Sequence, residues 1–445
     1  MRNRDHSLGL SRKYAPAFCI TPAMVLTLVL AAAPAAGGQT FTVLHAFTGY
    51  EGGLPASGLT GDQLGNMFGT AQLAGNTQAC PVDGCGAVYQ LTRQGSSWKF
   101  KTLYRFAGPA TGDGAQPMGR LTVAPDGTLY GTTFYGGVNA YSGICANIGL
   151  RSGCGTIFRL QPTLETCKHA DCEWNEEVLY TFKDLGTGIH PTSEVLLDSA
   201  GNLYGTTFIG GQFGYGVVYQ LSQVDGSWAY NVIHDIGSNS EGGEPFGGLV
   251  MDSAGNLFGA TSIGGTGGGG VIFELSRMGE GWNFQVLYNI GTNKSDGSGP
   301  YGTLIMDPSG NLFGSTVGGG ANDGGTVFEL ARSGDRSMYS VLADLPHGAS
   351  YYHDAGPHDK LMMDAAGNLY GTTSQDGAHL QGSAFELIKS PTGYTYTSLH
   401  DFGSEYDRIF YPWSNLVFDS QGKLYGTAQG GGSGNVGAVF EISPQ

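Results

Sequence analysis

The chain has 445 residues, of which 77 are Gly and 23 are Tyr, and only 13 % are charged. This composition favours many short strands joined by tight turns over helices, and an apolar content of 40 % excludes a wholly disordered chain. The formal net charge of −16 argues against binding to nucleic acid or to anionic membrane surfaces, because both need basic patches.

The N-terminal segment has the three parts of a secretory signal. Basic residues precede the apolar run MVLTLVLAAA at 24–33, and small residues follow that run. The run is too short to span a bilayer. We therefore predict a signal peptide at 1–36, cleaved near Ala36, with an uncleaved anchor as the alternative. We expect the mature chain to be secreted or periplasmic, monomeric and without stable membrane insertion.

Six cysteines remain after the predicted cleavage site, and they fall into three close pairs. The pairs are Cys80/Cys85, Cys145/Cys154 and Cys167/Cys172. An even number of cysteines in an exported chain predicts disulfides, each of which would close a short loop and stabilise it locally. A zinc site is the weaker alternative, because no C-x-x-C pair is present.

One seven-residue phrase recurs seven times along the chain. GNLYGTT occupies 201–207 and 367–373, and near-copies begin at Gly65, Gly127, Gly255, Gly310 and Gly422. The successive spacings are 62, 74, 54, 55, 57 and 55 residues, and the long second interval contains two of the cysteine pairs. A period in this range is typical of propellers, solenoids or arrays.

Each repeat reads as four short strands. In one unit, the apolar run GGLVMD at 247–252 and the run NLFGATS at 256–262 flank an Asp-Gly turn, which predicts an antiparallel hairpin. A Gly-rich loop leads to a third strand at 271–275, and a fourth follows at 282–290. The same third and fourth strands recur in the other units, so that each strand type has seven members.

The order of the strands indicates a closed ring. The mature chain begins with a fourth strand, FTVLHAF at 41–47, and ends with a third strand, AVFEI at 438–442. A linear array would leave both edges unpaired, whereas a ring lets the first strand complete the last unit. We predict an all-β fold, a single seven-bladed β-propeller of four-stranded blades at 37–445. A solenoid is the alternative, but it gives no reason for the permuted ends.

The repeat D-x-x-G-N-L-Y-G-T-T … G-G … G-x-V-F-x-L resembles the GloVer (Gloeo/Verruco) tandem repeat of exported bacterial proteins, some of which form the "choice-of-anchor" group. The resemblance covers the mature chain in seven copies, and it implies an exported repeat protein without implying an activity. The sequence ends at Gln445 without a sorting segment, which favours a free form over a tethered one. The D-x-x-G-N-L-Y turn is also loosely similar to NHL propeller repeats.

The loop that connects one unit to the next, called the connecting loop below, contains a Pro in every unit. Four of these loops carry an acid four residues before the Pro: Glu51, Asp113, Glu241 and Asp296. If the connecting loops share one face, these acids form a partial ring that could bind a cation or a polar ligand. The alternative is ordinary turn chemistry, in which Asp and Glu side chains serve their own loop.

The connecting loops before blades six and seven depart most from the others. They are rich in His, acids and aromatic residues, a combination that suits a carbohydrate cleft in which rings stack on sugar faces. The candidate ligand-binding residues are His353, Asp354, His358, Asp359, Glu405, Asp407, Arg408, Tyr411 and Trp413. The three His of the blade-six loop match no known zinc spacing, so metal binding stays open.

No nucleophile or nucleotide motif is present, since the chain lacks G-x-S-x-G, a P-loop and H-E-x-x-H. We therefore expect no cofactor and favour a non-catalytic binding or structural scaffold, whose partner is a carbohydrate or an envelope or extracellular protein. The alternatives are a polysaccharide lyase or hydrolase with its site in the loops of blades six and seven, and a purely structural envelope component.

Overall fold

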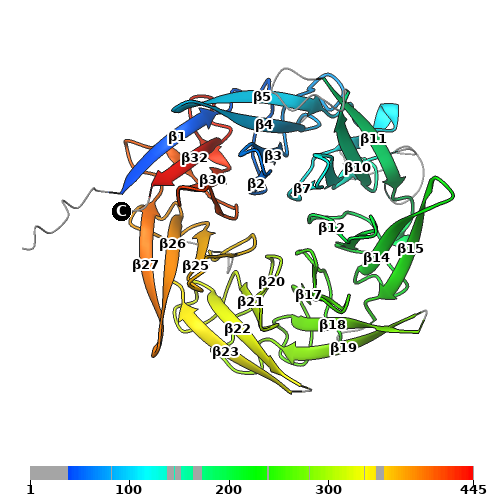
Figure 1. The fold of residues 1–445 in the computed structure, drawn as a ribbon, viewed down its shortest axis with the longest axis vertical. Coiled ribbons are helices and arrows are strands. Elements are labelled where there is room, and N and C mark those ends of the chain that lie inside the picture. Colours follow the sequence, from blue (N-terminus) through cyan, green and yellow to red (C-terminus); the bar gives the residue numbers. More distant parts are fainter. Residues whose placement is uncertain are drawn as a thin grey trace, which may run out of the picture. The chain divides into compact units, whose positions relative to one another are not determined.

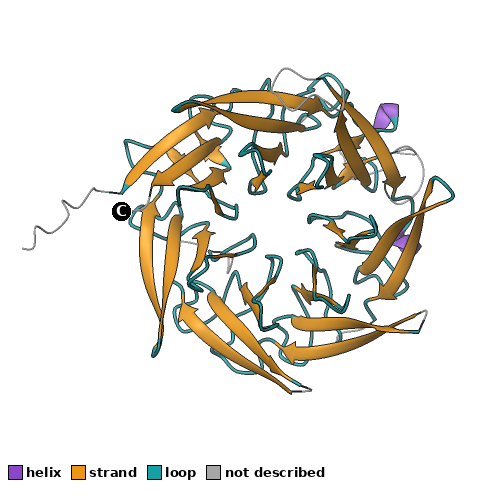
Figure 2. Cartoon of the chain, in the orientation of Figure 1, coloured by secondary structure: helices purple, strands orange, loops and turns teal. Residues whose placement is uncertain are grey.

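The computed structural model describes residues 39–81, 83–137, 145, 152–163, 173–237, 240–279, 281–334, 336–346 and 355–443. Within Gln39–Pro444, which form one compact unit, seven four-stranded antiparallel sheets are arranged as a ring (Figure 1). Strands dominate the described residues, and the helical segments there are two single 3₁₀ turns (Figure 2). The predicted all-β, seven-bladed propeller is therefore confirmed.

The blades are built in chain order, from the innermost strand to the outermost. Blade one contains β2 (Thr60–Gly61), β3 (Met67–Ala71), β4 (Ala87–Gln94) and β5 (Ser97–Arg105). Blade two contains β7 (Thr122–Val123), β8 (Leu129–Thr133), β10 (Thr156–Pro162) and β11 (Trp174–Thr181). Blade three contains β12 (Leu196–Leu197), β13 (Leu203–Thr207), β14 (Val217–Val224) and β15 (Ser227–Asp235).

The next three blades repeat this pattern. Blade four contains β16 (Val250–Met251), β17 (Leu257–Thr261), β18 (Val271–Met278) and β19 (Gly281–Asn289). Blade five contains β20 (Ile305–Met306), β21 (Leu312–Ser315), β22 (Thr326–Ser333) and β23 (Arg336–Asp344). Blade six contains β24 (Met362–Met363), β25 (Leu369–Thr373), β26 (Ser383–Ser390) and β27 (Gly393–Asp401).

Blade seven is assembled from both ends of the chain. Its strands are β29 (Val417–Phe418), β30 (Leu424–Ala428), β32 (Ala438–Ser443) and β1 (Thr40–Ala46). β1 pairs antiparallel with β32, from Thr40 opposite Ser443 to Ala46 opposite Ala438 (Figure 1). This pairing confirms the predicted closure of the ring by the N-terminal strand.

The connecting loops also contain short strands and 3₁₀ turns. Two minor sheets pair β6 (Gly114–Ala115) with β9 (Tyr135–Gly136) and β28 (Ile409–Phe410) with β31 (Gly430–Gly431). The 3₁₀ turns are η1 (Pro109–Thr111) and η2 (Leu185–Thr187). Each minor sheet thus pairs a connecting loop with the loop between the second and third strands of the following blade.

The repeated phrase GNLYGTT forms the inner hairpin and the second strand of a blade. In the Asp198 turn, the carboxylate accepts hydrogen bonds from the backbone N–H and the side-chain amide of Asn202, at 2.8 Å each. The Gly that follows the aromatic residue leaves room for a ring of the third strand. A Cβ built on Gly205 would lie 2.3 Å from the Tyr219 hydroxyl oxygen, so no larger residue fits beneath that ring.

The Thr hydroxyls of the phrase join neighbouring blades. Thr132 donates to the Ser193 carbonyl at 2.8 Å and Thr206 to the Gly247 carbonyl at 3.0 Å, each in the connecting loop of the next blade. Thr427 of blade seven donates in the same way to the Ser57 carbonyl at 2.9 Å, across the closure of the ring. The phrase therefore builds the scaffold both within a blade and between blades.

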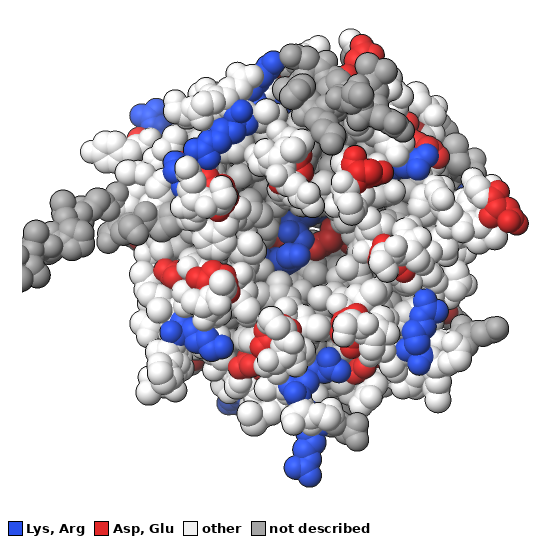
Figure 3. Space-filling view, viewed as in Figure 1, with Lys and Arg blue, Asp and Glu red and all other residues white. Residues whose placement is uncertain are grey.

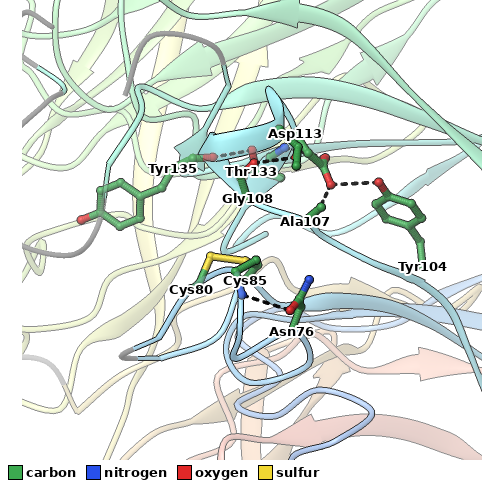
Figure 4. Close-up of a disulfide and its surroundings, with 12 residues drawn as sticks. Asn76, Cys80, Cys85, Tyr104, Ala107, Gly108, Asp113, Thr133 and Tyr135 are labelled. Atoms are coloured by element: carbon green, nitrogen blue, oxygen red, sulfur yellow. Dashed lines mark hydrogen bonds between the residues drawn. A yellow bond between two sulfur atoms is a disulfide. The ribbon is translucent and has the colours of Figure 1, made fainter. Parts of the chain in front are cut away.

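Two of the predicted disulfides are present among the described residues: Cys80–Cys85 and Cys145–Cys154. The Cys80–Cys85 bridge lies against the backbone of Gly108, at the start of the next connecting loop (Figure 4). The third predicted pair, Cys167 and Cys172, lies outside the described residues. In the part of the chain that is described, no helix is long and apolar enough to cross a membrane.

Candidate functional site at the mouth of the central channel

Six of the seven connecting loops are anchored by their Pro before they reach the centre of the ring. In these loops the Pro ring packs on a positive-φ Gly that precedes the third strand of the preceding blade. For example, a Cβ on Gly155 would meet Pro191 at 2.8 Å, and a Cβ on Gly216 would meet Pro245 at 2.8 Å. The three residues between this Pro and the next buried Leu are therefore held at the inner rim.

In four successive connecting loops, the residue directly after the Pro carries a ring. These four rings form a continuous arc, called the aromatic arc below. Phe246 stacks on Tyr301 with ring centroids 4.9 Å apart, and Tyr301 meets the edge of His358 at 5.7 Å. His358 stacks on Trp413 at 4.1 Å with the planes 4° apart. The arc spans the connecting loops before blades four to seven. The corresponding residues before blades one to three are Ala56, Met118 and Thr192, which bear no ring.

A buried ionic network lies at the same level of the channel and is called the charged floor below. Arg120 forms an ion pair with Glu194, and its Nε lies 3.6 Å from Oδ1 of Asp359. The Thr303 hydroxyl donates to Glu194 Oε2 at 3.2 Å. Figure 3 shows basic and acidic side chains together in the hollow at the centre of the ring. Connecting loops of four blades thus meet in one network.

Asp359 joins the loops of three blades through their backbones. Its carboxylate accepts N–H hydrogen bonds from Gly58 at 3.2 Å, from Asn415 at 3.1 Å and from Lys360 at 2.7 Å. These donors belong to the connecting loops before blades one, seven and six. Because the same carboxylate also faces Arg120, its position depends on the closure of the whole ring.

The charges of the floor shift each other's pKa values. Burial alone would raise the pKa of Glu194, but the Arg120 and Lys360 charges outweigh it and lower that pKa to about 2. The Arg120 charge, together with burial, lowers the pKa of Lys360 to about 8. Glu194 is therefore held ionised at neutral pH, and Lys360 is more easily deprotonated than an ordinary lysine.

The aromatic arc and the charged floor line one small pocket of about 40 Å³ at the mouth of the channel. Arg120, Glu194 and Thr303 also line the channel beneath, between the innermost strands, where Lys360 joins them. The charged floor thus lies between the mouth and the deeper channel. A ligand that enters the mouth would meet rings on one side and ionic and hydroxyl groups below.

The predicted ligand-binding residues divide into three groups. His358, Asp359 and Trp413 line the mouth pocket. Glu405, Asp407, Arg408 and Tyr411 do not line it: Asp407 instead accepts a hydrogen bond from His400 Nε2 at 2.8 Å, and Glu405 and Arg408 are exposed. His353 and Asp354 lie outside the described residues.

The four predicted ring acids are engaged within their own loops. Asp113 accepts hydrogen bonds from the Tyr104 hydroxyl at 2.8 Å and from the Ala107 N–H at 2.5 Å (Figure 4). Glu51, Glu241 and Asp296 likewise accept from backbone N–H groups of their loops, and none of the four lines the mouth pocket. These contacts are of the kind expected from the alternative given above, in which the acidic side chains serve their own loops. Among the described residues, no group of three or more His, Cys, Asp or Glu side chains could hold a metal ion.

Six residues of the site were not predicted from the sequence: Phe246, Tyr301, Arg120, Glu194, Thr303 and Lys360. The signal that identifies them is positional. When the seven connecting loops are aligned on their Pro, the next residue supplies the arc and the third residue supplies most of the floor. The departure of a loop from the common pattern points instead to the blade-six and blade-seven loops.

Comparison with known proteins identifies the repeat. The model of the Gloeobacter/Verrucomicrobia repeat matches residues 140–353 and 281–445, together more than half of the chain. The chain belongs to this family. The resemblance noted from the repeated phrase is therefore confirmed, although the "choice-of-anchor" label is not directly shown. No curated protein matches the chain significantly.

Two solved structures of low sequence identity are similar to this chain. A protein of unknown function from Dyadobacter fermentans is 12 % identical, with 90 % of this chain and 96 % of that chain covered and a TM-score of 0.46. The extracellular domain of a protein described as a hybrid two-component system from B. thetaiotaomicron is 10 % identical, with 90 % and 40 % covered and a TM-score of 0.51. At these identities the likeness concerns the fold alone.

Proposed function

We propose that this member of the Gloeobacter/Verrucomicrobia repeat family is a non-catalytic binding protein that holds a carbohydrate at the mouth of its channel. The observation that carries the proposal is the aromatic arc, in which four consecutive blades each place a ring at one rim. Aromatic rings present broad apolar faces without a large loss of side-chain entropy, and sugars offer matching C–H faces. The charged floor supplies hydrogen-bonding groups for the hydroxyls.

The asymmetry of the mouth supports a ligand over a purely structural role. A structural ring has no need for rings on one side and small side chains on the other. Here Phe246, Tyr301 and Trp413 keep part of their surfaces exposed, while Ala56 and Thr192 leave the opposite rim open. A pocket with apolar walls and a few convergent polar groups is typical of ligand sites.

The state of the acids favours binding over glycoside hydrolysis. A hydrolase needs one carboxylic acid that keeps its proton and a second carboxylate that acts as base or nucleophile. In the mouth pocket, Arg120 faces both Glu194 and Asp359, and the pKa of Glu194 is lowered to about 2. An acid held ionised in this way is poorly suited to protonate a leaving group.

The compartment proposed for this binding is extracellular or periplasmic. The two disulfides among the described residues are typical of chains that fold under oxidising conditions. The signal peptide at 1–36 stays a prediction, because these residues lie outside those that the structure describes.

A glycan-binding screen on the mature protein, followed by titration calorimetry with the best glycan, tests the proposal. We expect Trp413→Ala to weaken binding about fivefold, since an aromatic contact is worth about 1 kcal/mol. Tyr406→Ala is the matched control, because Tyr406 lies in the same connecting loop, is 99 % exposed and does not line the pocket. The control should bind as the unmodified protein does.

Two outcomes would contradict the proposal. The first is that no glycan in a broad screen binds the folded protein. The second is that Trp413→Ala and Tyr301→Ala both keep full affinity, with thermal unfolding unchanged. Either result would exclude the aromatic arc as a carbohydrate site.

A further inference from the structure

A basic residue is the last but one of the third strand in four of the seven blades: Arg93, Arg277, Arg332 and Lys389. In blade two the same position is Pro162. The strand registers establish the equivalence, since Pro162 is paired with Trp174 just as Arg277 is paired with Trp282. Blade two therefore lacks a cation that most other blades carry at this place.

These basic residues fill the groove between their own blade and the preceding one. The guanidinium group of Arg332 lies 4.2 Å from the ring centroid of Phe258 and 3.3 Å from Glu274 Oε2, both in blade four. The guanidinium group of Arg277 lies 4.1 Å from the Trp282 ring and donates to the Tyr204 hydroxyl of blade three at 3.3 Å. Each groove thus surrounds a cation with an aromatic face and oxygen acceptors.

Among the residues that the structure describes, the groove between blades one and two has equivalent walls and no cation. Phe68 is paired with Gln90 in blade one as Phe258 is paired with Glu274 in blade four. Phe68, Gln90, Pro162 and Trp174 line a pocket of about 260 Å³, together with the turns at 61–66 and 123–127. Phe68 and Trp174 meet edge to face at 6.1 Å.

Polar groups in this groove are left without partners. Gln90 is 3 % exposed, and its Oε1 has no hydrogen-bond partner among the described residues. A buried acceptor without a donor costs about 1–3 kcal/mol, so a ligand that donates to it would recover that loss. Oε1 of Gln90 stands where Glu274 offers its carboxylate to Arg332 in blade four.

The rim of the groove adds negative charge. In five turns the second carboxylate oxygen of the Asp accepts from the amide of an Asn, as Asp62 does from Asn66 at 2.7 Å. In blade two this turn has Ala124 in place of the Asp, since the Ala124 N–H bonds the Thr128 carbonyl at 2.8 Å as the Asp198 N–H bonds the Asn202 carbonyl at 2.9 Å. The acid of the blade-two turn is instead Asp126, which is exposed, accepts from the Thr128 N–H at 2.9 Å and lines the groove.

We propose that the groove between blades one and two binds the guanidinium group of an arginine side chain from a partner protein. The cation would stack on the Trp174 ring beside Phe68, as Arg277 stacks on Trp282 beside Tyr204, and would donate to Gln90 Oε1 with Asp126 at the rim of the groove. Guanidinium is favoured over ammonium because it stacks on aromatic faces and offers several donors in one plane. The net charge of −16 would draw basic partners towards the protein.

This site is independent of the mouth pocket. The turns at 61–66 and 123–127 join the first and second strands, so they lie at the opposite end of the blades from the connecting loops. No residue lines both pockets. Failure of carbohydrate binding and failure of arginine binding are therefore separate results.

The probe is N-acetyl-arginine methylamide, which stands for an arginine within a polypeptide, titrated into the full mature chain with NMR detection of the Trp174 indole N–H. The matched control probe is the citrulline analogue, which has the same shape and no charge. We expect the arginine probe to bind at least about tenfold more tightly. Equal binding of the two probes, or no shift of the Trp174 signal with either, would overturn the proposal.

Pro162→Arg tests the mechanism, because it restores the side chain that fills this groove in other blades. We expect this variant to lose arginine binding by about tenfold or more and to unfold at a higher temperature. Pro162→Ala is the matched control and should bind as the unmodified chain does. If Pro162→Arg folds and binds arginine normally, the proposal is wrong.

Gln90→Leu provides a second variant in case Pro162→Arg fails to fold. It removes the orphaned acceptor at nearly constant volume, so we expect weaker arginine binding together with unchanged or higher thermal stability. A merely structural role for Gln90 would change stability without changing the preference for arginine over citrulline. Retention of that preference in Gln90→Leu would contradict the proposal.

Discussion

Single residues of the repeated phrase carry separable tasks, and the sequence predicted most of them. The Asp of each inner turn caps its hairpin, as the Asp198–Asn202 bonds show. The aromatic residue packs between blades, as Tyr204 does in the core cluster of blade four. The role of the Thr was not predicted, because its acceptor lies in the next connecting loop, 41 residues further along for Thr206.

Replacement of Thr206 by Val tests this link between blades. Val keeps the shape of Thr but removes the hydroxyl that donates to the Gly247 carbonyl at 3.0 Å. The buried carbonyl would lose this donor, so we expect a loss of about 1 kcal/mol in the free energy of unfolding. Denaturant unfolding measures it, with Thr395→Val on the exposed face of β27 as control. A loss no larger than that of the control would contradict a stabilising role.

At the scale of elements, the outer strands of adjacent blades meet through stacked rings. His45 stacks on Phe100 at 3.7 Å, and Tyr288 on Tyr339 at 4.2 Å. The residue of blade two at the position of Phe100 and Tyr339 is Glu176, so no such stack forms beside Tyr104. Burial, followed by the charges of Asp113 and Glu177, raises the pKa of Glu176 to about 8. The interface between blades one and two, which contains the proposed arginine groove, thus also contains an acid whose ionised form is disfavoured by burial.

Glu176→Gln should reveal this acid through the pH dependence of stability. Folding raises the pKa of this acid from about 4.5 to about 8, so between these pH values the folded state keeps a proton that the unfolded state has lost. The free energy of unfolding therefore has its full value below pH 4.5, falls as the pH rises, and reaches its lower level above pH 8. We therefore expect the variant to unfold at a higher temperature than the unmodified chain at pH 8.5, and the difference to vanish near pH 4. Thermal scans at several pH values measure it.

The neighbouring acid supplies the control for this measurement. Glu177 is half exposed and forms an ion pair with Arg159 at 2.6 Å on the outer surface. Glu177→Gln should shift stability little and without the same dependence between pH 4 and 8, since exposed pairs contribute at most about 1 kcal/mol. If both variants show the same pH profile, the burial of Glu176 does not raise its pKa in solution.

At the scale of the whole molecule, the sequence predicted the ring but not what the ring brings together. The chain begins with a fourth strand and ends with a third strand, and this order predicted that the ring is closed. Only a ring pairs the strand at 41–47 with the last unit. The charged floor could not be found in this way, since Arg120, Glu194 and Asp359 come from loops far apart in the chain. Their contact depends on the rotation from blade to blade, which no local pattern encodes.

Ring closure makes the stability of every blade depend on β1. This strand pairs along its length with β32, Phe41 stacks on His400 at 3.9 Å, and Phe47 is fully buried next to it. Without it, β32 becomes an unpaired edge and the apolar surface around Phe47 is exposed to water. The Asp359 contacts to Gly58 and Asn415, which cross the same closure, would lose their support.

Deletion of residues 39–47 from the mature chain tests this dependence. We expect the temperature of unfolding to fall by about 10 °C or more and the transition to broaden, because several buried apolar side chains and a ladder of backbone hydrogen bonds are lost together. A synthetic peptide with the sequence of residues 39–48, added in trans, should restore part of the loss by pairing with β32. The mature chain that starts at residue 37 is the control. An unchanged transition would mean that the ring is equally stable without β1. That result would contradict the pairing of β1 with β32 as a source of stability.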